Sequence, residues 1–148
     1  MTAGRRVLVA TAKERRPATA LRLAGDLAGP KGDVVLAAVL VVPHSMPLGA
    51  ALDRPVAAAC EMLDEAEREA PVAGTFDTRL VRARSFAEGV LETLDAERFD
   101  LLLMERGMGP PIDGAVAQIT SLMEKAAPAV MLVRPALPTD GEGSTSGR

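Results

Sequence analysis

The sequence predicts an α/β domain: an open parallel sheet of five strands sandwiched by helices. Apolar runs of strand length alternate along the chain with segments whose apolar residues recur at helical spacing, in the order β-α-β-α-β-α-β-α-β. The apolar residues are mainly Ala, Val and Leu, with three Phe and neither Trp nor Tyr, which suits helices packed closely on a sheet. For such strands we expect the spatial order 3-2-1-4-5 with right-handed crossovers.

Each expected strand rests on its own apolar run. The first two, at 7–10 and 33–42, are almost entirely aliphatic, as expected of strands buried on both faces. Between 76 and 80 apolar residues alternate with polar ones, which predicts a strand at an edge of the sheet. The last two strands are expected at 100–104 and 129–133.

A helix is expected between each pair of consecutive strands. The first begins at Pro17, since proline is tolerated in the first turn, and the second spans about 54–70. Ser85 and Glu88 form a capping box that starts the third helix. Asp113 is expected to cap the fourth. Helical crossovers of this kind are what parallel strand pairing requires.

The composition bounds the domain organisation and the class of partner. We expect the α/β domain over 1–134 and a disordered tail over 135–148, because the tail is rich in Pro, Gly, Ser and Thr. The net charge of -3 and the shortage of aromatic side chains argue against a nucleic-acid partner. One cysteine, and no apolar run long enough for a signal peptide or a membrane span, predict a cytoplasmic protein without membrane insertion.

In the expected strand order the winding direction reverses between strands 1 and 4, and ligands of open parallel sheets usually bind at such a point. The loops 11–16 and 105–113 would line this crevice. A candidate ligand site is therefore expected between them.

Several segments occur in a characteristic order and spacing. They are Val7-Leu-Val-Ala-Thr11, Ala24-Gly-Asp-Leu-Ala28, Val41-Val42-Pro43, Phe99-Asp-Leu-Leu-Leu-Met104 and Ala127-Pro-Ala-Val-Met-Leu-Val-Arg134. Together they resemble the universal stress protein family over about residues 5–134. The resemblance implies an adenine nucleotide alpha hydrolase-like fold and a stress-response function. Because dimers of that family commonly pair the last strand across a two-fold axis, it also implies a homodimer through Ala129–Val133.

The sequence departs from the nucleotide-binding branch of that family, in which an Asp follows the first strand and a Gly-x-x-Gly, nine residues, Gly-Ser/Thr motif follows the fourth. Ala12 stands at the Asp position, Glu105 replaces the first glycine, and Val116-Ala117 replaces the Gly-Ser/Thr pair. Pro110 and Pro111 remove two N–H groups from the loop that would cradle phosphates. The resemblance is thus to a branch with a degenerate ATP-binding motif, and ATP or AMP is not expected as a cofactor.

Remnants of a nucleotide site are still visible in the sequence. Gly107, Gly109 and Gly114 remain glycines, although their spacing differs from the motif. By the resemblance, Val41 matches the position whose backbone contacts adenine. The candidate anion contacts in the crevice loops are Lys13, Arg15, Arg16 and Arg106.

The isolated reactive residues do not predict catalysis. His44 lies in a proline-rich connection and is expected at the surface, while Cys60 falls on the apolar stripe of the second helix and is expected in the core. The sequence contains no Ser-His-Asp arrangement, no Cys/His cluster with metal-ligand spacing and no Gly-Lys-Ser/Thr loop. We therefore expect no metal site and no enzyme.

The expected function is that of a regulatory or stress-response domain that does not bind ATP and acts through dimerisation or contact with a protein partner. The alternative is a stress protein that binds a nucleotide or another phosphorylated ligand through the basic loop residues. A third hypothesis is a small hydrolase in which Glu105 activates water.

Overall fold

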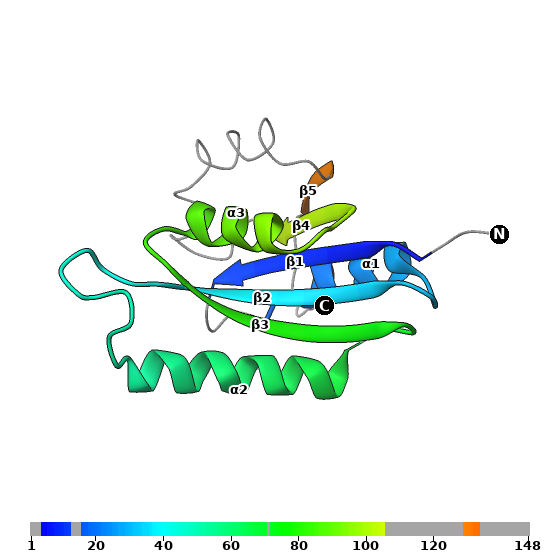
Figure 1. Cartoon of the computed structure of the whole chain (residues 1–148). Coiled ribbons are helices and arrows are strands. Elements are labelled where there is room, and N and C mark those ends of the chain that lie inside the picture. Colours follow the sequence, from blue (N-terminus) through cyan, green and yellow to red (C-terminus); the bar gives the residue numbers. More distant parts are fainter. Residues whose placement is uncertain (1–3, 13–15, 71, 106–128, 134–148) are drawn as a thin grey trace, which may run out of the picture.

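In the computed structural model, which describes residues 4–12, 16–70, 72–105 and 129–133, five parallel strands form one sheet in the order β3-β2-β1-β4-β5 (Figure 1). The strands are β1 (Arg6–Ala12), β2 (Asp33–Val41), β3 (Thr75–Ala83), β4 (Leu101–Glu105) and β5 (Ala129–Val133). The expected strand order is confirmed, and so is the edge position of β3. The expected fourth helix and the tail 135–148 lie outside the described residues.

Helices cover both faces of the sheet. They are α1 (Ala18–Ala28), α2 (Asp53–Glu69) and α3 (Phe86–Ala96). Leu21 of α1 and Leu63 of α2 belong to one buried cluster, whereas Phe86 and Val90 of α3 belong to the cluster on the opposite face. Among the described helices, α1 and α2 therefore share one face and α3 packs on the other, as expected for a sheet of parallel strands.

The interior of the sheet is aliphatic, as its sequence predicts. The largest fully buried side chains include Leu8, Leu36, Leu40, Leu102, Leu103 and Met104. They come from β1, β2 and β4, the strands with neighbours on both sides. Aliphatic side chains from central strands of this kind pack closely against the layers on both faces of the sheet.

Ser85 caps α3 as the sequence predicts. Its backbone is extended, and its hydroxyl oxygen accepts a hydrogen bond of 3.1 Å from the N–H of Glu88. One of the free N–H groups of the first helical turn is thereby satisfied, which fixes the point at which the chain turns from β3 into α3.

Cys60 lies at the surface, so the prediction that it belongs to the core is wrong. The buried residues of α2 are Ala59, Met62, Leu63 and Ala66, which follow the helical spacing i, i+3, i+4, i+7. Met62, rather than Cys60, completes the helical stripe that faces the sheet.

Glycines bring the chain segments before β2 and β3 into direct backbone contact at the amino edge of the sheet. A Cβ on Gly32 would lie 2.2 Å from the carbonyl oxygen of Ala28, and one on Gly74 would lie 2.2 Å from the carbonyl oxygen of Gly32. That same Gly32 oxygen accepts a hydrogen bond of 3.0 Å from the N–H of Thr75. A side chain at either glycine would separate these segments.

No described helix has both the length and the apolar character needed to cross a membrane.

Candidate functional site

The carboxyl ends of β1 and β4 lie side by side. Ala10 pairs with Met104 in the parallel register of these strands, and β1 pairs with β2 on its other side. From β1 the sheet is extended first toward β2 and β3 and then, on the other side, toward β4 and β5. This reversal of winding direction opens a crevice between β1 and β4 in sheets of this kind. Ala12 ends β1 at this edge, is buried, and presents only a methyl group.

Glu105, the last residue of β4, is buried with 3% of its surface exposed. Its Oε2 accepts a hydrogen bond of 2.8 Å from the backbone N–H of Ala20, in the first turn of α1. Pro17, the residue before α1, makes no side-chain cap. The carboxylate of Glu105 thus caps α1 from a different element, and its charge lies at the positive end of the helix dipole.

This contact gives Glu105 a role that sequence reasoning missed. The sequence identified it as a carboxylate beside a phosphate site or as a base that activates water. Its partner Ala20 is 85 residues earlier in the chain and bonds through its backbone, so no side-chain pattern marks it. The signal available was an acidic residue at the end of a buried strand, next to a helix whose start has no capping side chain.

Two arginines at the end of β3 hold the connection between β2 and α2. The Nη1 of Arg84 donates to the carbonyl oxygens of Pro43 and Met46 at 2.6 and 2.7 Å. Arg82 donates from its Nη1 to the carbonyl oxygen of Ala50 at 2.6 Å. These carbonyl acceptors are neutral, so they do not neutralise the two guanidinium charges at the carboxyl edge of the sheet.

Val41 and His44, both singled out from the sequence, lie near the same edge. Val41 ends β2 and its side chain is 39% exposed. His44 is exposed in the turn that follows β2, as expected. Arg16, one of the candidate anion contacts, forms an ion pair with Glu69 at the end of α2, so its charge is partly neutralised.

The remaining candidate site residues lie outside the described part of the chain. They are Lys13, Arg15, Arg106, Gly107, Gly109, Pro110, Pro111, Gly114 and Val116-Ala117. Within the described part, no three His, Cys, Asp or Glu side chains come together in a way that could hold a metal ion.

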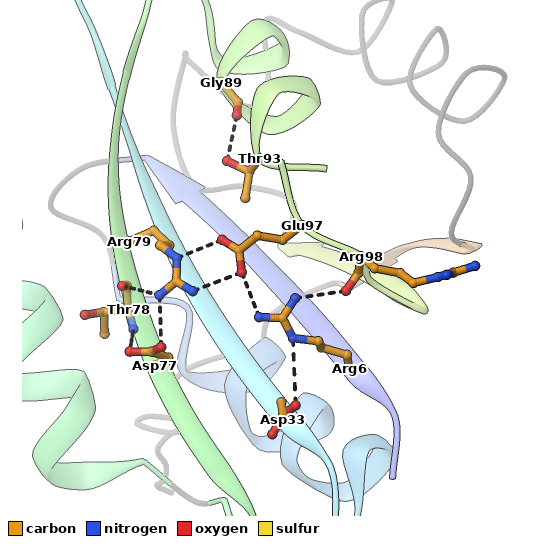
Figure 2. A network of polar contacts seen from close by, with 9 residues as sticks. All are labelled: Arg6, Asp33, Asp77, Thr78, Arg79, Gly89, Thr93, Glu97 and Arg98. Carbon is orange, nitrogen blue, oxygen red and sulfur yellow. Dashed lines mark hydrogen bonds and ion pairs between the residues drawn. The ribbon is translucent and has the colours of Figure 1, made fainter. Parts of the chain in front are cut away.

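A charged network lies away from the crevice, on the sheet face that α3 covers (Figure 2). Glu97, which follows α3, accepts hydrogen bonds from Arg79 at 2.8 and 2.9 Å and from Arg6 at 2.7 Å. Arg79 also contacts Asp77 at 3.0 Å. The hydrogen bond from Arg79 is the main reason why the pKa values of Glu97 and Asp77 lie below their usual range. The two carboxylates in turn raise the pKa of Arg79.

Comparison with known proteins supports the fold. No protein-family model and no curated protein sequence matches the chain. Solved structures do match. A universal stress protein from Archaeoglobus fulgidus has a TM-score of 0.62 and 16% identity, covering 90% of this chain and 99% of its own.

A universal stress protein solved in complex with cAMP has a TM-score of 0.61 and 17% identity, covering 89% of this chain and 98% of its own. The chain is therefore structurally similar to universal stress proteins over most of its length, with the same α/β arrangement around a five-stranded parallel sheet.

Proposed function

We propose that this chain is a cytoplasmic, universal stress protein-like regulatory domain that does not bind ATP and acts by dimerising or by contacting a protein partner. The observation that carries the proposal is the hydrogen bond between the buried Glu105 carboxylate and the Ala20 amide. This hydrogen bond supports the proposal because a carboxylate of the protein itself already occupies the N-terminus of α1 beside the crevice.

The charge of Glu105 opposes a bound triphosphate. Two like charges at 4 Å repel by about 1 kcal/mol in water and by about 4 kcal/mol at the effective dielectric of a protein surface. Relief of the repulsion by moving Glu105 would leave the Ala20 amide without its 2.8 Å acceptor, and an unsatisfied buried amide costs about 1–3 kcal/mol. Either arrangement weakens the binding of phosphates beside β4.

The neighbouring residues also offer a triphosphate little. The Ala12 side chain cannot accept a hydrogen bond from a ribose or coordinate a cation bound to phosphate. Pro110 and Pro111 supply no amide donors, and Val116-Ala117 supplies no hydroxyl. The departures from the nucleotide-binding pattern thus remove contacts to the ribose as well as contacts to the phosphates.

We propose that the protein is a homodimer that pairs through β5. This strand forms an edge of the described sheet and exposes 39% of Leu132. An aliphatic edge strand presents free backbone donors and acceptors, and pairing with a second copy across a two-fold axis would satisfy them.

A second candidate function is the binding of a nucleotide or another phosphorylated ligand with less charge than ATP. The observation that favours it is the similar structure solved in complex with cAMP. A cyclic monophosphate carries one negative charge, so its repulsion by Glu105 is smaller than that of a triphosphate. The charges of Arg82 and Arg84 at the same edge of the sheet would attract it.

Nucleotide release and calorimetry separate the two candidates. Purified protein is denatured and the supernatant is analysed for nucleotide; folded protein is then titrated with Mg-ATP and with cAMP. We expect neither a stoichiometric nucleotide nor ATP binding in the wild-type chain. Stoichiometric ATP would contradict the proposal, and saturable binding of cAMP alone would establish the second candidate.

A matched pair of variants tests the part assigned to Glu105. We expect Glu105→Ala to bind ATP more tightly than the wild type, because the internal charge is gone. Glu92→Ala, which removes an exposed carboxylate from α3, should leave binding unchanged. Equal responses of both variants would show that Glu105 does not exclude the phosphates.

We also propose that the chain is not an enzyme. Glu105 is only 3% exposed and its Oε2 accepts from the Ala20 amide, whereas a general base must reach the proton of a water molecule. We expect no ATP hydrolysis above the background rate. Turnover that disappears in Glu105→Gln would overturn this proposal in favour of the hydrolase.

A further inference from the structure

The backbone of β3 has an inner side bonded to β2 and an outer side at the sheet edge. Near its start, the N–H of Thr75 donates to the carbonyl oxygen of Gly32 at 3.0 Å, and at its end the carbonyl oxygen of Ala83 accepts from Val42 at 2.8 Å. In a parallel strand, the N–H and C=O of one residue point to one side and those of the next residue to the other. Thr75 and Ala83 face β2, and so do the other odd-numbered residues between them. Thr78 is even-numbered, so its N–H and C=O face outward.

Both outward backbone groups of Thr78 already have partners within the chain (Figure 2). Its N–H donates to Oδ1 of Asp77 at 3.1 Å. Its carbonyl oxygen accepts from Nη1 of Arg79 at 3.0 Å. The two side chains that flank Thr78 in sequence thus take the places that a neighbouring strand would occupy, at the middle of β3.

Arg79 is held in this position from two sides. Its Nε and Nη2 donate to the two carboxylate oxygens of Glu97 at 2.8 and 2.9 Å, in the bidentate geometry that fixes a guanidinium most firmly. Its Nη1 lies 3.0 Å from Oδ2 of Asp77. Glu97 is itself held by Arg6 at 2.7 Å. Release of Thr78 would break several charge-assisted contacts at once.

We propose that Asp77 and Arg79 close the outer edge of β3 to an added strand, with Glu97 as the residue that positions Arg79. A strand from a second copy of this chain would need consecutive outward donors and acceptors to extend the sheet, and at Thr78 both are occupied. The inference goes beyond the proposed function, since it concerns no ligand. Its consequence is that copies of the chain cannot join β3 to β3 or β3 to β5.

The test measures the concentration dependence of mass by analytical ultracentrifugation. We expect Asp77→Ala/Arg79→Ala to form assemblies larger than the wild type, at concentrations about tenfold lower than any at which the wild type grows. Arg22→Ala/Asp26→Ala is the matched control, because it removes the same two residue types from exposed positions of α1. This control should keep the mass of the wild type.

A third substitution identifies the edge that assembles. Thr78→Pro removes the outward N–H without breaking a bond to β2, and proline is tolerated at edge strands in this orientation. Added to Asp77→Ala/Arg79→Ala, it should return the mass to that of the wild type. Growth that persists in the triple variant would show that another surface assembles and would overturn the proposal.

Glu97→Gln keeps Asp77 and Arg79 and weakens only the contact that positions Arg79. We expect assembly intermediate between those of the wild type and the double variant. If the double variant does not fold, as judged by circular dichroism, Glu97→Gln decides alone. A folded variant of either kind that keeps the wild-type mass throughout the concentration range would overturn the proposal.

Discussion

Gly89 of α3 packs directly on Val39 of β2. A Cβ added at Gly89 would lie 2.7 Å from Cγ1 of Val39 and 3.3 Å from Cβ of Ala83. Both residues are buried, and Val39 belongs to the cluster that lines the α3 face. The missing side chain therefore sets how closely α3 approaches the sheet.

We predict that Gly89→Ala lowers the free energy of unfolding by about 1–3 kcal/mol, because the added methyl overpacks the interface. Alanine improves helix propensity by about 1 kcal/mol, but Val39 cannot turn away cheaply, since a β-branched side chain has few rotamers. Urea unfolding of both proteins measures the difference. Val39→Ala provides the control: in that background Gly89→Ala should cost less than in the wild type. An equal loss in both backgrounds would rule out the clash as the cause.

We predict that Glu105→Gln destabilises the fold by about 1 kcal/mol. The neutral amide can still accept from Ala20, but it loses the interaction of a negative charge with the start of α1. Urea unfolding at neutral pH measures this loss, with Glu92→Gln as the exposed control. If both substitutions have the same small effect, the charge of Glu105 does not stabilise α1.

The network around Arg79 predicts an acid-dependent loss of stability. Hydrogen bonds from Arg79 lower the pKa values of Asp77 and Glu97 from their usual 3.8 and 4.5. The carboxylates of Asp77 and Glu97 therefore bind protons less readily in the folded state than in the unfolded chain. The stabilisation is complete above the usual pKa values and is lost as the pH falls through the lowered ones.

Urea unfolding at about pH 6 and about pH 3 measures this loss. The charged groups that face the two carboxylates are Arg79, Arg6 and, through Arg6, Asp33. The variant Asp77→Asn/Glu97→Gln should lose less stability between the two pH values than the wild type. Equal losses would contradict the prediction.

Cys60 should react fully with a thiol reagent in the native state. Its side chain is exposed on α2, so no unfolding is needed for access. Cys60→Ser should change the free energy of unfolding by less than about 0.5 kcal/mol, the usual range for surface substitutions. Slow labelling that accelerates only in denaturant would place the thiol in the core after all.

The strand order could be predicted because each strand signals its own environment. The unbroken aliphatic run of β2 marks a central strand, and the alternation around Thr78 marks an edge. The prediction for α2 was wrong at Cys60, because Met62 lies on a helical face that overlaps the predicted one and is the face that packs on the sheet. Only the position of the sheet decides between the two faces.

The chemistry at the strand ends could not be predicted in the same way. Glu105 bonds a backbone amide 85 residues away, and Arg6 reaches Glu97 across 91 residues. Such partners meet only after the sheet has formed, and backbone partners have no side-chain signature. Local patterns do identify Ser85, because its partner Glu88 is one helical turn away.

Gly32 fits closely against Ala28, and Gly74 fits closely against Gly32. The loops at the two ends of the sheet therefore differ in how much sequence variation they tolerate. At the glycine end, an inserted residue would push neighbouring strands out of alignment, so the loops there must keep their length. At the other end, the connection from β2 to α2 is tied down by Arg82 and Arg84 through main-chain oxygens, and any residue type can supply those. Sequences related to this one can therefore vary the connection from β2 to α2 while the strands keep their alignment.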